Sequence, residues 1–335
     1  MRSLLTLLFA GVFIILQAQN TEKNFAIAIH GGAGWILKEK MSAEEIKQHE
    51  EKLKEAVNAG YAVLEKGGSS LDAVTKAIII LEDSPLFNAG KGAVFTHEES
   101  NELDASIMDG KSLKAGAVAG INRVKNPIMA ARAVMEISEH VMLSGKGAEA
   151  FAESVGLELV DPEYFKTPDR LKSLQELKQK EANKKDQGYV PNEIWPDYKY
   201  GTVGAVALDK NGSLAAATST GGMTNKRYGR IGDAPIIAAG TYADNNTCAV
   251  SCTGHGEYFI RKVVAYDVSA KMKYAKKTLL EAAGEAIEET RILGGKGGLI
   301  AIDQKGNIAT PFSTPGMYRA WKKSSGEEQI KMFAD

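Results

Sequence analysis

The pair Gly201-Thr202 has the residue types that a self-cleaving threonine hydrolase needs. Thr202 opens an apolar segment, residues 203–208, and directly follows a polar stretch of the chain. Glycine can adopt strained backbone conformations that expose its carbonyl, so the Thr202 hydroxyl could attack the Gly201 carbonyl and form an ester that water opens. The α-amine released has an ordinary pKa of about 7.7–8.0, which suits a general base near neutral pH. The alternative is an ordinary threonine at the start of a strand.

Three segments that follow Thr202 are rich in residues that can take part in catalysis or ligand binding. They bring together hydroxyl groups, an arginine, an aspartate and several glycines, and they cover residues 218–223, 225–235 and 252–257. Each segment alone indicates little.

Taken together with the first half of the chain, these segments resemble the plant-type asparaginase and isoaspartyl peptidase family of N-terminal-nucleophile hydrolases. The shared motifs cover nearly all of the chain from residue 25, at residues 30–34, 85–90, 103–105, 201–209, 218–223, 229–235, 252–257 and 314–319. The resemblance implies an α/β fold, a four-layer αββα sandwich. It also implies hydrolysis of β-aspartyl amide bonds, releasing L-aspartate from isoaspartyl dipeptides and L-asparagine.

The resemblance implies a role for each group near the reacting bond. Thr202 resembles the nucleophile, with the bond between Gly201 and Thr202 as the site of self-cleavage. Thr220 resembles the hydroxyl that hydrogen-bonds Thr202 and tunes it. The Thr253 hydroxyl and the Gly254 N–H resemble an oxyanion hole, which stabilises developing negative charge.

The same resemblance implies two anchors for a zwitterionic substrate. Arg230 would bind the α-carboxylate through its planar fork, and Asp233 would bind the α-ammonium group. The alternative is a plain surface ion pair between these two side chains. The remaining substrate-binding residues implied are Thr253, Gly254, Gly256 and Asn88.

No cofactor for catalysis is expected, and no spacing of His and Cys suggests zinc. The resemblance implies a structural sodium ion held by backbone carbonyls of one loop, namely those of Leu81, Glu82, Ser84, Phe87, Ala89 and Lys91. We interpret His255 as a packing residue and Glu257 as a structural one, and we expect His49, His97 and His140 to be solvated.

Strands and helices must position these groups. Two hairpins share one pattern, in which an apolar strand, a polar turn with Gly and a second strand follow one another, at residues 203–218 and 299–310. Helical stretches lie between them, near residues 257–268 and 276–291. Sheets with helices packed outside them give a layered sandwich.

The first half of the chain begins with a short apolar strand, residues 25–29, followed by a Gly-rich turn at residues 30–34. Ser42 and Glu45 form a capping box for a helix that stops at Gly67. Ile46, Leu53, Val57 and Leu64 share one face of that helix. Two more helices are expected, one from near Ser69 to before Pro85, and one that starts at the Asn126 cap and runs to about Leu143.

The chain divides at the expected cleavage site. Residues 19–201 would form an α subunit and residues 202–335 a β subunit of one domain. Residues 166–200 are polar and are expected to form a mobile linker, with a frayed helix over residues 171–187. We expect a dimer of α–β heterodimers.

Composition limits the partners. The net charge is −1 and no basic patch stands out, which argues against nucleic acid. Arg2 and the apolar run that follows, residues 4–16, predict a signal peptide over residues 1–18. That run is shorter than the roughly 20 residues that span a bilayer. We therefore expect an exported protein, periplasmic or secreted, with small β-aspartyl substrates and no membrane partner.

The two cysteines of the chain are Cys248 and Cys252. They lie on an expected strand, about 13 Å apart, whereas a disulfide needs Cα atoms within roughly 7 Å. Both are expected to be buried thiols.

Two other functions compete. A glycosylasparaginase of the same fold usually carries Thr-Ile-Gly-Met and Thr-Asn-Gly where this chain has residues 202–205 and 220–222. An exported binding protein could use residues 31–34 as an anion cradle, although the Gly-Lys-Ser/Thr ending of a phosphate loop is missing. The sequence leaves the preference between asparagine and isoaspartyl peptides open.

Overall fold

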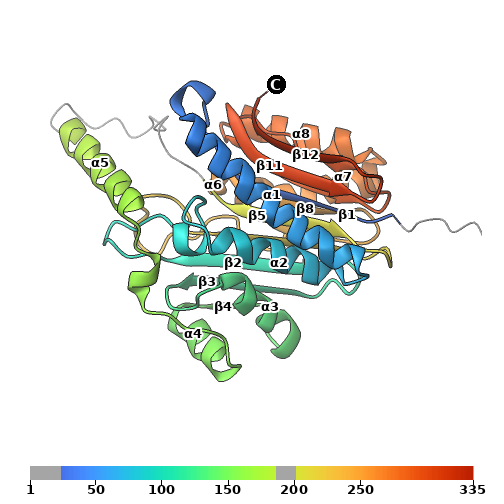
Figure 1. Cartoon of the computed structure of the whole chain (residues 1–335), viewed down its shortest axis with the longest axis horizontal. Coiled ribbons are helices and arrows are strands. Elements are labelled where there is room, and N and C mark those ends of the chain that lie inside the picture. The colour runs from blue at the N-terminus through green and yellow to red at the C-terminus, as the bar shows by residue number, and fades with distance from the viewer. Residues whose placement is uncertain (1–23, 186–200, 335) are drawn as a thin grey trace, which may run out of the picture.

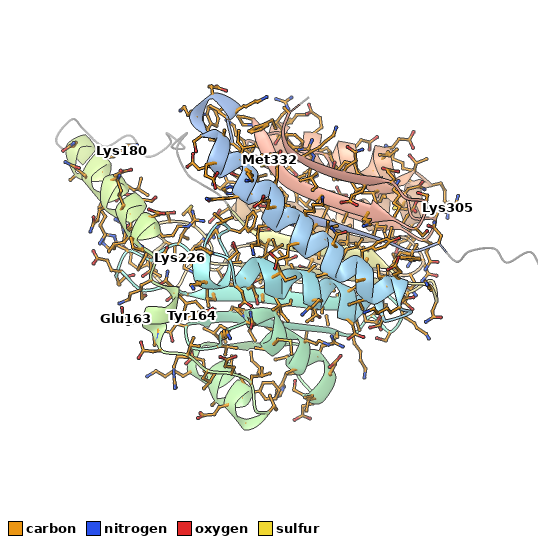
Figure 2. All side chains as sticks on the ribbon, in the orientation of Figure 1. Glu163, Tyr164, Lys180, Lys226, Lys305 and Met332 are labelled. Carbon is orange, nitrogen blue, oxygen red and sulfur yellow. The ribbon has the colours of Figure 1, made fainter. Side chains whose placement is uncertain are left out.

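The computed structural model describes residues 24–185 and 201–334. Within them, an eight-stranded sheet has the strand order β12-β11-β1-β5-β6-β2-β3-β4, and a four-stranded sheet has the order β10-β9-β8-β7. Neighbouring strands are antiparallel except β3 and β4. Helices pack outside the sheets (Figure 1), and Figure 2 adds the described side chains in the same view.

The large sheet consists of β1 (Ala26–Gly34), β2 (Leu103–Asp109), β3 (Ala115–Ile121), β4 (Met142–Ser144), β5 (Val203–Leu208), β6 (Leu214–Thr220), β11 (Gly316–Lys323) and β12 (Glu328–Phe333). The small sheet consists of β7 (Thr241–Ala243), β8 (Cys248–Gly254), β9 (Gly297–Asp303) and β10 (Ile308–Ala309). The α-helices are α1 (Ala43–Glu65), α2 (Ser70–Glu82), α3 (Pro127–Ile137), α4 (Gly145–Ser154), α5 (Pro168–Lys185), α6 (Gly256–Lys262), α7 (Val264–Ala275) and α8 (Leu279–Ile292). Short 3₁₀ turns are Lys38–Lys40, Gly90–Gly92 and Pro162–Phe165.

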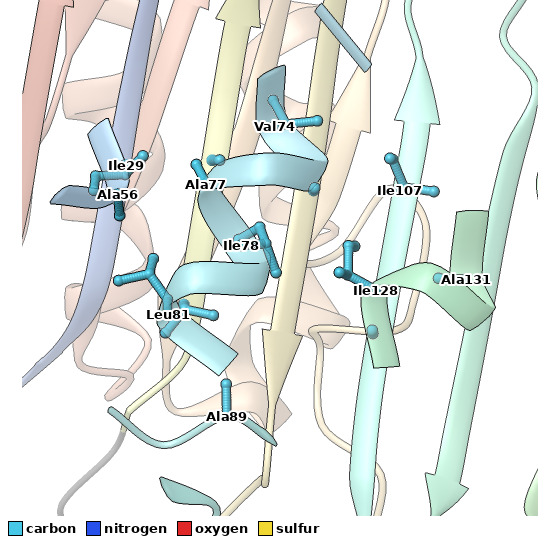
Figure 3. Packing of buried hydrophobic residues seen from close by; sticks show 14 of the residues in the cluster. Ile29, Ala56, Val74, Ala77, Ile78, Leu81, Ala89, Ile107, Ile128 and Ala131 are labelled. Atoms are coloured by element: carbon cyan, nitrogen blue, oxygen red, sulfur yellow. The ribbon is translucent and has the colours of Figure 1, made fainter. Parts of the chain in front are cut away.

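Three apolar layers separate four layers of secondary structure. The first fills the space between α1–α3 and the large sheet, where the side chains of α2 face the strands (Figure 3). The second lies between the two sheets, and the third lies between the small sheet and α6–α8. The expected αββα sandwich is confirmed.

Strand β5 is central, and both of its faces are buried. Val203, Ala205 and Ala207 join the layer under the helices, whereas Val206 and Leu208 join the layer between the sheets. This alternation follows from the two-residue period of a strand. Because β5 pairs with β1 and β6, the residue before it sits between the ends of two neighbouring strands.

Several local predictions are confirmed. Ser42 and Glu45 make the reciprocal capping-box hydrogen bonds of α1, and Ser69 caps α2. Both predicted hairpins are present, as β5–β6 and β9–β10. Cys248 and Cys252 are buried free thiols on β8.

The Gly-rich segment at residues 30–34 continues β1 and does not form the expected turn. The strand extends to Gly34, with an irregularity between His30 and Gly32 in its pairing to β11. No helix of the described residues begins directly after it, since a 3₁₀ turn at Lys38 comes next. This segment therefore lacks the helix N-terminus that an anion-binding cradle would need.

Other boundaries also differ from the predictions. Helix α3 ends at Ile137 and not near Leu143, because the Ser138 hydroxyl donates to the Val134 carbonyl and Leu143 then pairs with β3. Asn126 does not cap α3 with its side chain, which donates to Asp83 instead. The helix expected near residues 257–268 is two helices, divided at Val263 with φ 45°.

The first part of the expected linker, residues 166–200, contains an ordered helix. Helix α5 extends from one side of the molecule (Figure 1), and its Leu174 side chain is buried. The rest of the expected linker, residues 186–200, lies outside the described part of the chain, as does the expected signal peptide over residues 1–18. No helix in the described part of the chain is long and apolar enough to cross a membrane.

Helix α3 approaches β3 so closely that one strand position has no room for a side chain. A Cβ atom at Gly116 would lie 2.0 Å from the Ala131 carbonyl oxygen and 2.5 Å from the Met135 nitrogen, both in the helix backbone. These backbone atoms can make room for a Cβ atom only if the whole helix moves away from the sheet.

We predict that Gly116→Ala lowers the free energy of unfolding by about 1–3 kcal/mol, the range typical of overpacking. Gly284→Ala is the matched control, because Gly284 lies within α8 with no atom near its Cβ position. That variant should be neutral or more stable by up to about 1 kcal/mol. Urea unfolding of both variants measures the difference, and equal stability would contradict the close packing of α3 on β3.

Candidate active site

Thr202 is buried at the start of β5 and takes part in a directed chain of hydrogen bonds. Its hydroxyl donates to the Thr220 hydroxyl at 3.1 Å, and the Thr220 hydroxyl donates to the Gly201 carbonyl at 3.0 Å. The Gly222 N–H also donates to the Thr220 oxygen, at 3.0 Å. The nucleophile, its neighbouring hydroxyl and the expected scissile carbonyl are therefore in contact.

Asn88 gives the Gly201 carbonyl a second donor. Its side-chain Nδ2 donates to the carbonyl oxygens of Gly201 and Gly222, each at 2.7 Å. Its Oδ1 accepts the Val94 N–H at 2.9 Å, which fixes the orientation of the amide. Two donors on one carbonyl oxygen would stabilise negative charge that develops there during attack. Asn88, which was expected to bind substrate, thus contacts the carbonyl of the expected cleavage site directly.

Two glycines leave enough room for the closely packed backbone around the bond between Gly201 and Thr202. Gly32 has φ +111°, and a Cβ atom there would lie 2.9 Å from the Gly201 Cα. A Cβ atom at Gly201 itself would lie 2.8 Å from the Asn88 Cβ. A larger residue at either position would push the scissile bond away from its hydrogen-bond donors.

His30 holds the carbonyl of the nucleophile residue. Its Nδ1 lies 2.8 Å from the Thr202 carbonyl oxygen and its Nε2 lies 3.0 Å from the Ser251 hydroxyl. A carbonyl oxygen only accepts, so Nδ1 carries the proton and Nε2 accepts from Ser251. Burial lowers the pKa of His30 to about 3, which keeps the ring neutral. Sequence reasoning missed this role, because a single buried His carries no spacing signal.

A pocket adjoins the Thr202 hydroxyl. It is lined by Gly201, Thr202, Thr220, Gly222, Met223, Arg230, Gly232, Asp233 and Gly254. The structure therefore brings together the expected nucleophile, both expected substrate anchors and one half of the expected oxyanion hole.

Arg230 pairs with Glu257 and not with Asp233. Its Nε and one terminal nitrogen each donate to a Glu257 carboxylate oxygen at 2.9 Å. The other terminal nitrogen lies near the Cβ positions of Gly232 and Gly222, on the pocket side. The alternative of a plain ion pair between Arg230 and Asp233 is thus not observed. Glu257, interpreted from the sequence as structural, instead binds Arg230 beside the pocket.

Asp233 presents a buried carboxyl group to the pocket. Burial raises its pKa to about 7, and the nearby Arg230 opposes this shift only in part. Its Oδ2 has no hydrogen-bond partner among the described residues. An acceptor that is buried and unpaired beside a pocket suits a cationic group of a ligand. Gly256 makes room for both anchors, because a Cβ there would lie within 3.0 Å of Asp233 and 2.8 Å of Arg230.

Thr253 and Gly254 end strand β8 beside this pocket. Gly254 lines it with φ +144°, a conformation that favours glycine. The Thr253 hydroxyl is fully buried and accepts the Ala33 N–H at 3.3 Å, which leaves its own proton available to donate. His255 packs its ring against Tyr258 at 4.9 Å, as expected, and its Nε2 lies 3.8 Å from Glu257.

Backbone carbonyl groups of α2 and of the loop after it lie close to two glycines of that loop. Cβ atoms at Gly90 and Gly92 would lie 2.4 Å from the Glu82 carbonyl oxygen and 2.1 Å from the Phe87 carbonyl oxygen. No cluster of three His, Cys, Asp or Glu side chains in the described residues could hold a metal. Neutral oxygen donors without carboxylates fit a hard monovalent cation such as sodium. The carboxyl group of Glu82 points elsewhere, accepting from Ser219 at 2.7 Å.

Two histidines expected to be solvated are in contact with other side chains. His49 stacks on Tyr318 with ring centroids 4.6 Å apart, and His97 places Nδ1 2.7 Å from the Asn225 side-chain oxygen. His140 is exposed, as expected.

Comparisons with known proteins agree with this geometry. The family model described as asparaginase matches residues 23–332. The isoaspartyl peptidase of Escherichia coli strain K12 is 54% identical over 296 residues, covering 88% of this chain and 92% of that protein. The isoaspartyl peptidase/L-asparaginase of Danio rerio is 41% identical, covering 86% and 89%. The plant-type L-asparaginase of Thermococcus kodakarensis is 43% identical, covering 90% and 98%.

The contact of Asn88 with the Gly201 carbonyl predicts that Asn88→Ala slows cutting between Gly201 and Thr202. Loss of one donor to a developing oxyanion typically costs about 10²–10³ in rate. Asn101→Ala is the matched control, because Asn101 is a buried asparagine that donates to Ala93 and Val94 instead. A time course on denaturing gels measures both rates. Cutting of Asn88→Ala at the parent rate would remove Asn88 from the reaction.

Proposed function

The chain belongs to the asparaginase family, and we propose that it cuts itself before Thr202 and then uses Thr202 as the nucleophile of its hydrolase reaction. It hydrolyses β-aspartyl amide bonds, since relatives 41–54% identical over most of its length are isoaspartyl peptidases and L-asparaginases. The observation that supports the proposed mechanism is the directed contact from Thr202 through Thr220 to the Gly201 carbonyl, at the edge of a pocket with two charged anchors.

The proposed self-cleavage is an N-to-O acyl shift followed by hydrolysis. The Thr202 oxygen attacks the Gly201 carbonyl carbon and releases its proton towards Thr220. Asn88 and Thr220 stabilise the carbonyl oxygen while it is negatively charged. The Gly201–Thr202 C–N bond breaks, the nitrogen takes up a proton, and water hydrolyses the ester. Gly201 keeps a carboxylate, and Thr202 keeps a free hydroxyl and α-amine.

The proposed turnover repeats this chemistry on the substrate. The α-amine of Thr202 takes the hydroxyl proton, and the oxygen attacks the β-carbonyl carbon of the aspartyl group. The Thr253 hydroxyl and the Gly254 N–H would stabilise the oxyanion. The leaving amine takes the proton, and water then hydrolyses the acyl-enzyme to release L-aspartate. His30 keeps the Thr202 backbone in place throughout.

The proposed anchors account for recognition of the aspartyl group. Arg230 would bind the α-carboxylate with its pocket-facing nitrogen, while Glu257 keeps the guanidinium in position. Asp233, with one unpartnered oxygen, would bind the α-ammonium group. Because these anchors contact only the aspartyl part, they serve asparagine and isoaspartyl peptides alike.

Four further parts of the proposal concern the whole protein. Residues 1–18 would be removed as a signal peptide on export, and residues 19–201 and 202–335 would stay together as α and β subunits. Two such heterodimers would form the assembly. The loop carbonyls of Leu81, Glu82, Ser84, Phe87, Ala89 and Lys91 would hold a structural sodium ion, which takes no part in the reaction. The glycosylasparaginase and binding-protein alternatives are not retained, because the relatives named above are isoaspartyl peptidases and L-asparaginases.

Thr202→Ala is expected to remain a single chain without hydrolase activity, because it lacks the attacking oxygen. Thr202→Ser should cut more slowly, since serine keeps the hydroxyl but loses the β-methyl group that restricts χ1. Mass spectrometry of the secreted parent protein should find products beginning near Gln19 and at Thr202. Hydrolysis of β-aspartyl substrates by a protein that mass spectrometry shows to be uncut would contradict the mechanism, although not the hydrolase function.

The raised pKa of Asp233, about 7, predicts a pH dependence of substrate binding. The carboxyl must lose its proton to bind an ammonium group, so KM for L-asparagine should rise as pH falls below about 7. Succinamate, which has the same amide and carboxylate but no ammonium group, is the matched control and should lack this rise. A KM for L-asparagine that does not change with pH between about 5 and 8 would contradict the role of Asp233.

A further inference from the structure

Helix α5 is attached to the molecule mainly by polar contacts. Arg170, near its start, donates to the carbonyl oxygens of Gly92 at 2.9 Å and Leu86 at 3.2 Å. Lys178 forms an ion pair with Glu99 at 2.9 Å. These contacts attach the helix to residues 86–99, and none of them involves the loop that leads to Arg230.

The far end of α5 contacts the loop that leads to Arg230. The Glu181 carboxylate accepts from the Asn225 side-chain nitrogen at 2.8 Å and from an Arg227 terminal nitrogen at 2.9 Å. Figure 2 labels Lys226, between these two residues, on the same side of the molecule as α5. One carboxylate thus binds two side chains of a single loop, residues 223–229.

This loop has an unfavourable backbone conformation. Asn225 has φ 65° and Tyr228 has φ 60°, in the left-handed region that asparagine tolerates but a bulky residue such as tyrosine rarely adopts. The Tyr228 side chain is fully exposed, so packing of that ring does not hold the loop. Such conformations persist only where surrounding contacts impose them.

Glu181 completes a consistent set of such contacts. The Asn225 nitrogen donates to Glu181, so the Asn225 oxygen faces His97, whose Nδ1 lies 2.7 Å from that oxygen and 3.2 Å from an Arg227 guanidinium nitrogen. The backbone N–H of His97 donates to the Lys226 carbonyl at 2.9 Å. The side-chain amide of Asn225 is therefore bound at both ends, and the loop is fixed against two separate elements.

The loop transmits this constraint to the substrate anchor. The Arg230 N–H donates to the Arg227 carbonyl at 3.1 Å, while the Arg227 side chain is bound to Glu181. Glu257 holds the Arg230 guanidinium from α6. Two carboxylates thus position Arg230, Glu257 through the guanidinium and Glu181 through Arg227 and the Arg230 backbone.

We infer that Glu181 is a positioning residue that fixes Arg230 for binding of the substrate α-carboxylate, an inference that rests on the proposed role of Arg230. Glu181 precedes Gly201 in the chain and the loop follows it, so the contact crosses the expected cut. It is non-covalent and does not involve the cleaved bond. Helix α5 of the upstream subunit therefore contributes to substrate affinity after maturation.

The test is Glu181→Gln in the full-length, matured enzyme, which removes the charge and keeps the shape. We expect KM for L-asparagine to rise about two- to fivefold, the effect of losing a partly exposed charged contact, with kcat unchanged and unchanged self-cleavage. Arg227→Gln should raise KM similarly, and the double variant should be no worse than either single variant, because both remove the same contact.

Two control variants separate this role from general attachment of the helix. Glu176→Gln changes an exposed acid on α5 for which the structure shows no contact with the loop. Lys178→Gln breaks the ion pair with Glu99 and leaves the loop contacts intact. Both should keep the parent KM. A similar rise of KM in Lys178→Gln would overturn the specific role of Glu181.

A second readout does not depend on activity. Amide hydrogen exchange of residues 222–230 should be faster in Glu181→Gln than in the parent and in both controls. If the parent protein hydrolyses no β-aspartyl substrate, the proposed function fails, while exchange still tests the contact of Glu181 with the loop. Parent-like KM together with parent-like exchange in Glu181→Gln would overturn the inference.

Discussion

The Gly201 carbonyl oxygen accepts hydrogen bonds from Asn88 and Thr220, and much of the structure is needed to bring these donors together. Asn88 comes from the loop after α2, and Thr220 ends β6. Gly32, on β1, leaves the space through which the Gly201 backbone passes. Three segments far apart in the sequence must therefore meet within hydrogen-bond distance. The pairing of β5 between β1 and β6 aligns the strand ends, and the apolar layer beneath α2 fixes the loop that bears Asn88.

This arrangement places polar groups where burial is unfavourable for them. His30 is kept neutral in the interior, and Asp233 retains an oxygen without a partner. A core optimised for stability alone would satisfy or remove such groups. They are tolerated because both ring nitrogens of His30 are hydrogen-bonded and because Asp233 faces the pocket. Buried polar groups that are concentrated around one pocket are expected at a functional site.

The parts of the fold that were predictable are those with short-range signals. The Ser42 capping box and the β5–β6 hairpin depend on residues close in sequence, and both are present. The end of α3 and the continuation of β1 through residues 30–34 depend on pairing with distant strands, so local patterns misplaced them. For the same reason, the motifs named Arg230 and Asp233 but gave no sign that Glu257 would bind Arg230, or that His30 would bind the Thr202 carbonyl.

The same groups serve the uncut and the cut chain, which has a consequence for activation. Gly201 lines the pocket beside Arg230 and Asp233, so the uncut chain places its own carbonyl next to the groups proposed to bind substrate. The contact between Thr202 and Thr220 is already formed while the bond is intact. The proposed activation therefore requires no rearrangement of the Thr202 hydroxyl. The proposed cleavage would supply the amine that acts as base and would free Gly201 to leave the reacting position, so the change that creates the enzyme would be chemical and local.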